Sequence, residues 1–279
     1  MRTRSDGRIY SVRRPLAAFC AGAAVAVLGG LIGLGGAEFR LPLLIAVFEL
    51  YPHRAVRINL LVSLATLAVS AGARLGFTDA ANVADFGVEI VAMLIGGVIA
   101  AWIGAAALAR IPKGRVVGVI GVLLFAIAAL LVLESLFAGA TDLALPNDQL
   151  LRAGVAAFAG IVVGAVSSML GVAGGELIIP VLIFIFGADI RAAGTASVLI
   201  STPIVLVGIF RHLLAGHYRS RSMLGYLVLP MSGGSVLGAL AGGYLAAWAP
   251  ADVLRLVLAA ILGVSAAKLM WFSPHKQAD

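Results

Sequence analysis

The sequence is poor in the residues that build metal centres and soluble catalytic sites. It has one cysteine and four histidines among 279 residues, and charged residues make up only 12% of it. The single Cys20 excludes an intramolecular disulfide and a cysteine-ligated zinc or iron–sulfur cluster. The histidines lack the spacing of metal ligands, and no phosphate-binding P-loop occurs. We therefore expect no metal, no cofactor, no catalytic residues and no enzymatic activity.

Apolar residues, by contrast, account for 62% of the chain and give it a mean hydropathy of +1.09. A soluble domain is only about half apolar. The apolar runs do not show the alternating pattern of an outer-membrane barrel. The sequence thus predicts an all-α polytopic membrane protein embedded in the lipid bilayer. Runs of roughly twenty apolar residues, enough for a helix to cross the hydrocarbon core, lie near 16–34, 55–76, 87–109, 116–137, 153–170, 192–214, 223–247 and 252–272.

The chain contains one sequence unit twice. With an offset of 138 residues, glycines, a glutamate and a proline of the first half superpose on the same residue types in the second, and after a gap the offset is 137. The matched pairs include Gly36 with Gly174, Glu38 with Glu176, Pro42 with Pro180, Arg54 with Arg191, and Gly96-Gly97 with Gly233-Gly234. We therefore predict two membrane repeats of the same architecture.

These repeats divide the chain into five parts. Repeat 1 covers 16–137 and repeat 2 covers 153–272, and a polar, acidic linker at 138–152 joins them. Segments 1–15 and 273–279 are the two terminal tails. The linker is expected on the outer (periplasmic) side of the membrane and both tails in the cytoplasm.

Two membrane topologies compete for each repeat. If 16–50 and 153–187 each cross the membrane once, the chain has eight spans and its basic residues divide between both sides. If each of these segments instead enters and returns as a re-entrant hairpin, Lys and Arg gather much more strongly on one side, as in cytoplasmic loops. We adopt the hairpin. A hairpin plus three transmembrane helices is an odd number of crossings, so the second repeat is inverted relative to the first.

The basic balance of the chain, a net charge of +7, fits this topology. In a soluble protein it would suggest nucleic acid as a partner. Here the basic residues lie between the apolar runs, where they set orientation. We expect no nucleic-acid binding.

A glycine-rich break carrying a glutamate lies at the same place in both predicted hairpins, at 33–38 and 171–176. A helix that begins after such a break directs its amide groups and positive dipole end at the cavity, which suits an anion. Glu38 and Glu176 are costly at membrane depth unless paired, protonated or functional. Burial favours the neutral form of a carboxylate, so either could carry a coupling proton. The alternative is a structural salt bridge or a cap on nearby amides.

Polar residues next to the breaks form a second group of candidates. Arg40 has no basic counterpart in repeat 2, and could pair with Glu38 or attract an anion. Short polar side chains at the start of the following helix suit oxyanion coordination, although ordinary N-capping is the alternative. The predicted substrate-binding residues are Gly36, Ala37, Glu38, Asn59, Gly174, Gly175, Glu176, Thr195 and Ser197, with Arg40 and Arg57 as additional anion or pairing contacts.

These features together resemble the TauE/SafE family, the sulfite exporter or four-toluene-sulfonate uptake family of permeases. The resemblance covers nearly the whole chain. It rests on the paired glycine-rich, proline-containing hairpins, the segments 54–56 and 191–197 that follow them, and third spans that end at Pro112 and Pro250. It implies a secondary carrier of sulfite, sulfonates or related small anions in the bacterial inner membrane. The chain departs from the family pattern at 57–59, where Arg-Ile-Asn replaces Gly-Thr-Ser, and at Ala37, which replaces a glycine.

The leading hypothesis is therefore a secondary transporter of small sulfur-containing or organic anions, with a proton or cation as the coupling ion. It places the protein in the inner (plasma) membrane as a multi-pass protein with both termini cytoplasmic. Oligomers are compatible with the sequence. The alternative is a membrane scaffold or signalling protein that moves no substrate, in which the hairpins are packing devices.

Overall fold

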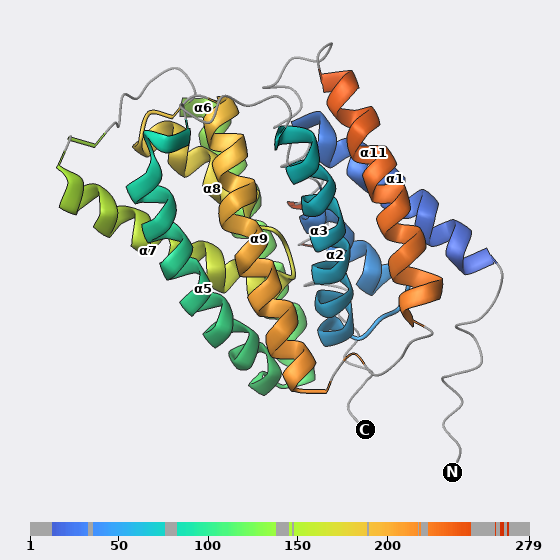
Figure 1. The fold of residues 1–279 in the computed structure, drawn as a ribbon. Helices are drawn as coiled ribbons and strands as arrows, with labels where there is room; N and C mark the ends of the chain where they lie inside the picture. Colours follow the sequence, from blue (N-terminus) through green and yellow to red (C-terminus); the bar gives the residue numbers. More distant parts are fainter. Residues whose placement is uncertain are drawn as a thin grey trace.

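The computed structural model describes residues 13–32, 36–75, 83–137, 145–146, 148–188, 190–216, 218, 223–246, 260, 263–264 and 267. All regular structure in these residues is helical, as the sequence predicts (Figure 1). The helices are α1 (Arg13–Ile32), α2 (Ala37–Ala46), α3 (Pro52–Leu75), α5 (Gly87–Arg110), α6 (Lys113–Phe137), α7 (Gln149–Leu170), α8 (Gly175–Pro180), α9 (Ile190–Leu214) and α11 (Leu229–Ala246), with π-helical turns η1 (Val181–Ile185) and η2 (Leu224–Val228).

Several of these helices are long and apolar enough to cross a membrane, and the protein is a polytopic membrane protein. Five spans within the described residues meet that test, and each coincides with a predicted apolar run. The predicted run at 252–272 lies almost entirely outside the described residues. The five spans are Pro52–Gly72, Gly87–Arg110, Gln149–Leu170, Ala192–Leu214 and Leu224–Gly242.

Helix α5 shows how residue size is sorted around a membrane helix. Its buried face carries small residues, including Gly96, Gly97 and Gly104, while Ile95 and Ile103 stand more than half exposed on the opposite face. Small residues allow two helix backbones to approach closely, and lipid accepts large apolar side chains as readily as a protein core does. The small face of α5 accordingly packs against α7.

Two close helix contacts hold the structure together, α1 with α11 and α5 with α7. A Cβ atom added at Gly22 on α1 would collide with the backbone oxygen of Met231 on α11. In the same way a Cβ added at Gly160 on α7 would collide with the backbone oxygen of Met93 on α5. The two contacts are repeat counterparts, because an offset of 138 residues relates Gly22 to Gly160 and Met93 to Met231. The first arm of each predicted repeat, α1 or α7, thus packs against the second transmembrane helix of the other repeat, α11 or α5.

Both predicted hairpins contain a break between two helices. Helix α7 ends at Leu170, Gly171 caps it in the left-handed conformation, and α8 begins at Gly175. In the first repeat α2 begins at Ala37, and residues 33–35 lie outside the described part. Helix α7 starts at Gln149, where Asp148 accepts hydrogen bonds from two backbone amides, so the last residues of the expected linker are already helical.

The prolines of the hairpins do not stop the returning arms. Pro42 lies inside α2, which continues to Ala46, and Pro180 stands where α8 passes into the π-helical turn η1. A wider turn after proline accommodates the missing backbone N–H. Helical structure therefore continues past both prolines.

The helices form two bundles (Figure 1). One hydrophobic cluster joins residues of α1, α2, α3, α6 and α11, and another joins residues of α5, α7, α8 and α9. A third cluster, which includes Leu60 on α3 and Ile209 on α9, fills the boundary between the bundles. Helices α3 and α9 run in opposite directions along this boundary, as their colours in Figure 1 show. The two hairpin breaks meet beside the same boundary.

Candidate functional site

The returning arms of both hairpins begin with a glycine in the left-handed conformation. Gly36, with φ of 69°, precedes α2, and Gly174, with φ of 83°, precedes α8. A side chain at either position would be strained by its backbone, and it would also be crowded, by Val25 at Gly36 and by Val163 at Gly174. Glycine is therefore required at both breaks by conformation and by space.

These glycines place Glu38 and Glu176 in the first turns of α2 and α8, where both side chains are only 1% exposed. The two side chains lie within hydrogen-bonding reach of each other. Among the described residues, Oε2 of Glu38 and both carboxylate oxygens of Glu176 have no hydrogen-bond donor. The structure thus brings together the two carboxylates that the sequence marks as counterparts.

Arg40 is completely buried two residues beyond Glu38. Its guanidinium donates to Oδ1 of Asn59 at 3.1 Å, to Oγ of Ser63 at 3.0 Å and to Oγ of Ser235 at 3.1 Å. The sequence left open whether Arg40 pairs with Glu38. It acts on the Glu38 carboxylate electrostatically, but forms no ion pair with it among the residues described.

The partners of Arg40 tie the first hairpin to the second. Asn59 donates through Nδ2 to the carbonyl oxygen of Ala37 at 2.8 Å and to that of Leu170 at 3.4 Å. Ser63 donates to the carbonyl of Gly171 at 3.3 Å. The carbonyls of Leu170 and Gly171, which the end of α7 leaves without intrahelical donors, are satisfied in this way at membrane depth. Asn59 lies two turns inside α3, so it is not an N-cap; its side chain links the two breaks.

Sequence reasoning missed Ser63 and Ser235, although both are fully buried. Ser63 lies one helical turn after Asn59, so helical periodicity could have identified it. Ser235 is 195 residues from Arg40 in the chain, and no local pattern connects the two. Its hydroxyl also donates to the carbonyl of Gly22 at 3.4 Å.

Of the remaining predicted residues, the structure brings Ser197 close to the second break. Its Oγ lies 3.9 Å from the position that a Cβ on Gly175 would occupy, and it donates to the carbonyl of Gly194 at 2.9 Å. Thr195 is partly buried on the same helix, two residues before Ser197. Ser201, one turn further along α9, is buried, and its hydroxyl has no partner among the described residues.

Arg57 lies in a different environment. Its Nε donates to the carbonyl of His53 at 2.9 Å, and the hydroxyl of Tyr218 donates to the Arg57 carbonyl at 3.2 Å. Burial raises the pKa of Tyr218 above its ordinary value. In these contacts the structure does not bring Arg57 to the paired carboxylates.

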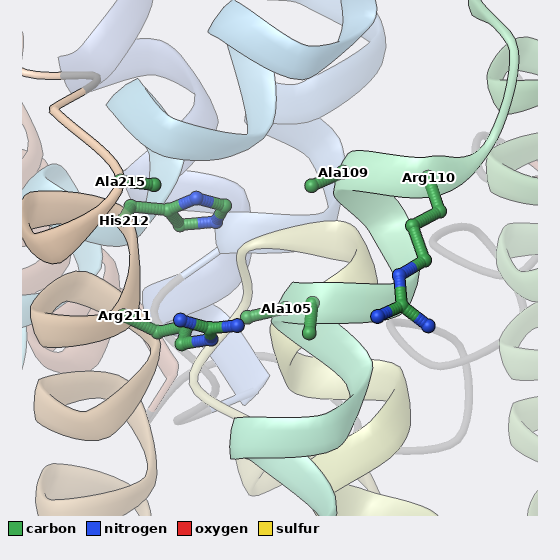
Figure 2. A pocket seen from close by; sticks show the side chains of 7 residues that line it. Ala105, Ala109, Arg110, Arg211, His212 and Ala215 are labelled. Atoms are coloured by element: carbon green, nitrogen blue, oxygen red, sulfur yellow. The ribbon is translucent and has the colours of Figure 1, made fainter.

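A small hollow of about 160 Å³ opens where α5 and α9 end. Arg110, Arg211 and His212 line it together with alanines, and Figure 2 shows Arg211 and His212 facing Ala105 and Ala109 across it. Arg211 also lies over the ring of Trp102 at 4.9 Å. We call this the basic hollow. Fourteen residues of α9, about 21 Å of helix, separate Arg211 from Ser197, so the basic hollow is distinct from the carboxylate pair.

No group of histidine, cysteine, aspartate and glutamate side chains within the described residues could hold a metal ion. The site therefore consists of two carboxylates, one guanidinium and short polar side chains around two helix breaks. Such a set can bind protons and small anions.

No curated protein and no solved structure matches the chain. The family model described as Sulfite exporter TauE/SafE matches residues 18–269, which include every described helix from α2 to α11 and most of α1. This is a family of membrane permeases. The chain belongs to the sulfite exporter TauE/SafE family.

Proposed function

We propose that the protein is a secondary permease for small sulfur-containing or organic anions, such as sulfite or short sulfonates. The observation that carries this proposal is that the two hairpin breaks, one from each half of the family-matched region, meet in one buried polar cluster containing Glu38 and Glu176. Paired helix breaks near the membrane midplane are where secondary transporters hold substrate. A scaffold needs neither buried carboxylates nor interrupted helices, so this arrangement favours transport.

The inverted arrangement of the two halves is part of the proposal. Three observations support it: the opposite directions of α3 and α9, the matched contacts of Gly22 with Met231 and of Gly160 with Met93, and the shared location of Arg110 and Arg211. The eight-span topology would place the two arginines on opposite sides of the membrane. The hairpin topology places both in the cytoplasm, with both termini, in the plasma (inner) membrane.

In this proposal an oxyanion binds between the starts of α2 and α8. The first amides of a helix have no intrahelical acceptor, and those near Ala37 and Gly175 therefore remain available to an anion. Arg40 supplies a positive charge that is fixed in place by its three hydrogen bonds. Thr195 and Ser197 supply hydroxyl groups from α9, because a hydroxyl that rotates away from its own backbone can donate to a ligand. Glu38 and Glu176 must be neutralised when the anion is present.

The basic hollow is the cytoplasmic approach to this site in our proposal. Arg110 and Arg211 give its rim a positive potential that concentrates anions locally. Its lining is otherwise mostly alanine, so the anion meets few donors that would retain it. The hollow is thus an entrance and not a second binding site.

Purified protein in proteoliposomes tests this function. Labelled sulfite or methanesulfonate should cross the membrane of vesicles that contain the protein and not of empty vesicles. Gly36→Leu and Gly174→Leu should each abolish the flux, because a side chain at either break would collide with the first arm of its own hairpin, at Val25 or Val163, and displace the start of the returning arm. Gly187→Leu is the matched control, since Gly187 also has a positive φ but faces open space.

The outcomes separate the hypotheses. Vesicles that accumulate neither anion would indicate a scaffold or signalling protein. Flux that survives both leucine substitutions would retain the permease and reject the site between the hairpins. Flux lost equally in Gly187→Leu would attribute the effect to backbone strain alone.

A further inference from the structure

Most carboxyl oxygens of Glu38 and Glu176 are buried without a hydrogen-bond donor. Both residues are buried, they lie within reach of each other, and three of their four oxygens have no donor among the described residues. Two ionised carboxylates have acceptors only, so their contact would be purely repulsive. One proton between them supplies the donor and removes the repulsion.

No other described group takes this role. Each nitrogen of the Arg40 guanidinium donates to one of Asn59, Ser63 and Ser235, and Arg40 forms no ion pair with either glutamate within the described part of the chain. The helices packed against α2 and α8 carry other charged or titratable groups with described side chains, but all except the exposed Cys20 on α1 lie in the first two or last two turns. They are His53, Arg54 and Arg57 on α3, Arg115 on α6, Arg152 on α7, and Arg211 and His212 on α9.

Several of these groups already have partners of their own. Arg57 donates to the His53 carbonyl, Arg152 pairs with Glu89, and Arg211 lies over Trp102. The electrostatic balance around the breaks therefore involves two carboxylates and Arg40. With both carboxylates ionised this cluster has a net charge of −1, and with one proton it is neutral, which is the favourable state for a group of charges removed from water.

We propose that Glu38 and Glu176 share one proton in the resting protein and take up a second proton when an anion binds beside Arg40. This inference rests on the proposed function and adds the identity of the coupling ion. A monovalent anion brings one negative charge into the neutral cluster, and protonation of the second carboxylate restores neutrality. One O–H bond forms on that carboxylate, the proton comes from water, and no other bond changes. Transport of a monovalent anion is then a symport with one proton and moves no net charge.

The charge balance makes an unusual prediction for single substitutions. In Glu38→Gln, Glu176 alone neutralises Arg40 at rest and can still accept a proton when the anion binds. Glu176→Gln behaves in the same way with Glu38. Only the double variant loses the coupling, because two glutamines leave Arg40 to balance the anion without a proton. A conventional single proton carrier would instead lose coupling in one single variant.

Proton uptake on binding tests the stoichiometry. Methanesulfonate is the probe because it stays ionised near neutral pH, and uptake is followed in weakly buffered detergent solution together with the amount bound. We expect about one proton per anion in the wild type, in each single variant and in the exposed control Asp85→Asn. We expect binding without uptake in Glu38→Gln/Glu176→Gln. Wild-type binding without uptake, or unchanged uptake in the double variant, would overturn the proposal.

Infrared spectroscopy of the wild type tests the resting state even if the double variant does not fold. A protonated carboxyl band should be present near neutral pH without substrate, should be absent in each single glutamine variant, and should grow when methanesulfonate binds to the wild type. A band that persists in both single variants would reject the shared proton. If no anion binds to any variant while the resting band behaves as expected, the proposed substrate is rejected and the shared proton of the carboxyl pair is retained.

Discussion

Nε of Arg40 lies 3.1 Å from Oδ1 of Asn59, and the same asparagine holds the carbonyl of Ala37 with its amide nitrogen. The side chain of Asn59 thus connects the buried guanidinium to the start of α2. Both residues are 0% exposed. Removing the partners of a buried charge is strongly destabilising, because the charge is then left uncompensated.

Removal of the guanidinium should destabilise the protein strongly. Arg40→Met keeps the length of the side chain but leaves Asn59, Ser63 and Ser235 without their donor, and we expect a loss of about 3–5 kcal/mol. The measurement is thermal or denaturant unfolding in detergent. Arg54→Met, at an exposed position of α3, should change stability by less than about 0.5 kcal/mol. Equal effects of the two substitutions would show that the network around Arg40 has no special role.

Substituting alanine for the hairpin glycines should distinguish the energetic cost of a positive φ from the cost of a steric collision. Gly36→Ala and Gly174→Ala combine an unfavourable positive φ with a collision, against Val25 and Val163 respectively. Gly187→Ala and Gly216→Ala have the same backbone conformation in open space, and should lose only about 1–2 kcal/mol. We expect clearly larger losses at the hairpins. Similar unfolding temperatures for all four variants would contradict this.

Much of this architecture follows from the sequence because it depends on local rules. The thickness of the hydrocarbon core sets the length of an apolar run, and the predicted runs coincide with α3, α5, α7, α9 and α11. Glycines at the breaks permit backbone conformations that other residues avoid, so the sequence also indicates where the breaks lie. The matched glutamates can be recognised in the sequence because a charged side chain inside a membrane is energetically costly and therefore rare.

The contacts of the site depend on helix rotation and on distant segments, which the sequence does not reveal. Arg57 and Asn59 stand two residues apart on α3 and therefore face different directions, so that only Asn59 reaches the breaks. The hydrogen bond from Arg40 to Ser235 depends on how α11 packs against α1. The contacts of Gly96 with Ala157 and of Gly234 with Phe19 are also related by an offset of 138, whereas the sequence pairing at this point uses 137.

Close packing of α7 against α5 should make Gly160 sensitive to a single methyl group. A Cβ at this position would collide with the backbone of Met93, so Gly160→Ala should push the helices apart and reduce stability by about 1–3 kcal/mol. Gly154→Ala, on the same helix but in open space, should be neutral or stabilising by up to about 1 kcal/mol. Unfolding in detergent compares the two, and a neutral Gly160→Ala would rule out this tight contact.

Membrane sidedness can be tested at the basic hollow. Ala109→Cys and Ala215→Cys, each in a Cys20→Ser background because Cys20 is exposed, introduce thiols at two ends of helices that meet there. An impermeant maleimide should label neither position from the periplasm and both after permeabilisation. Asp148→Cys, at the start of α7, should react without permeabilisation. Labelling of 109 and 215 from opposite sides would restore the eight-span topology.

Tyr218 should make stability depend on pH in the alkaline range. Its partly buried hydroxyl donates to the carbonyl of Arg57, and burial raises its pKa above the ordinary value of 10.0. The stabilisation is therefore present below about pH 10, and it is lost as the pH rises towards the folded-state value, because the unfolded chain ionises first. Tyr218→Phe should cost about 1 kcal/mol at neutral pH. The difference between the two proteins in unfolding experiments should narrow at higher pH, and a constant difference would contradict the assignment.

The contacts of α1 with α11 and of α5 with α7 each join one predicted repeat to the other, and this affects what cleavage of the chain would produce. Each bundle contains helices from both repeats, so cleavage at the linker would not release two independently folded halves. Co-expressed fragments should instead reassociate into one particle, and either fragment alone should be degraded or should pair with a second copy lying in the opposite orientation. In the topology we propose, such pairing would reproduce between two copies the contacts that the two predicted repeats make within one chain.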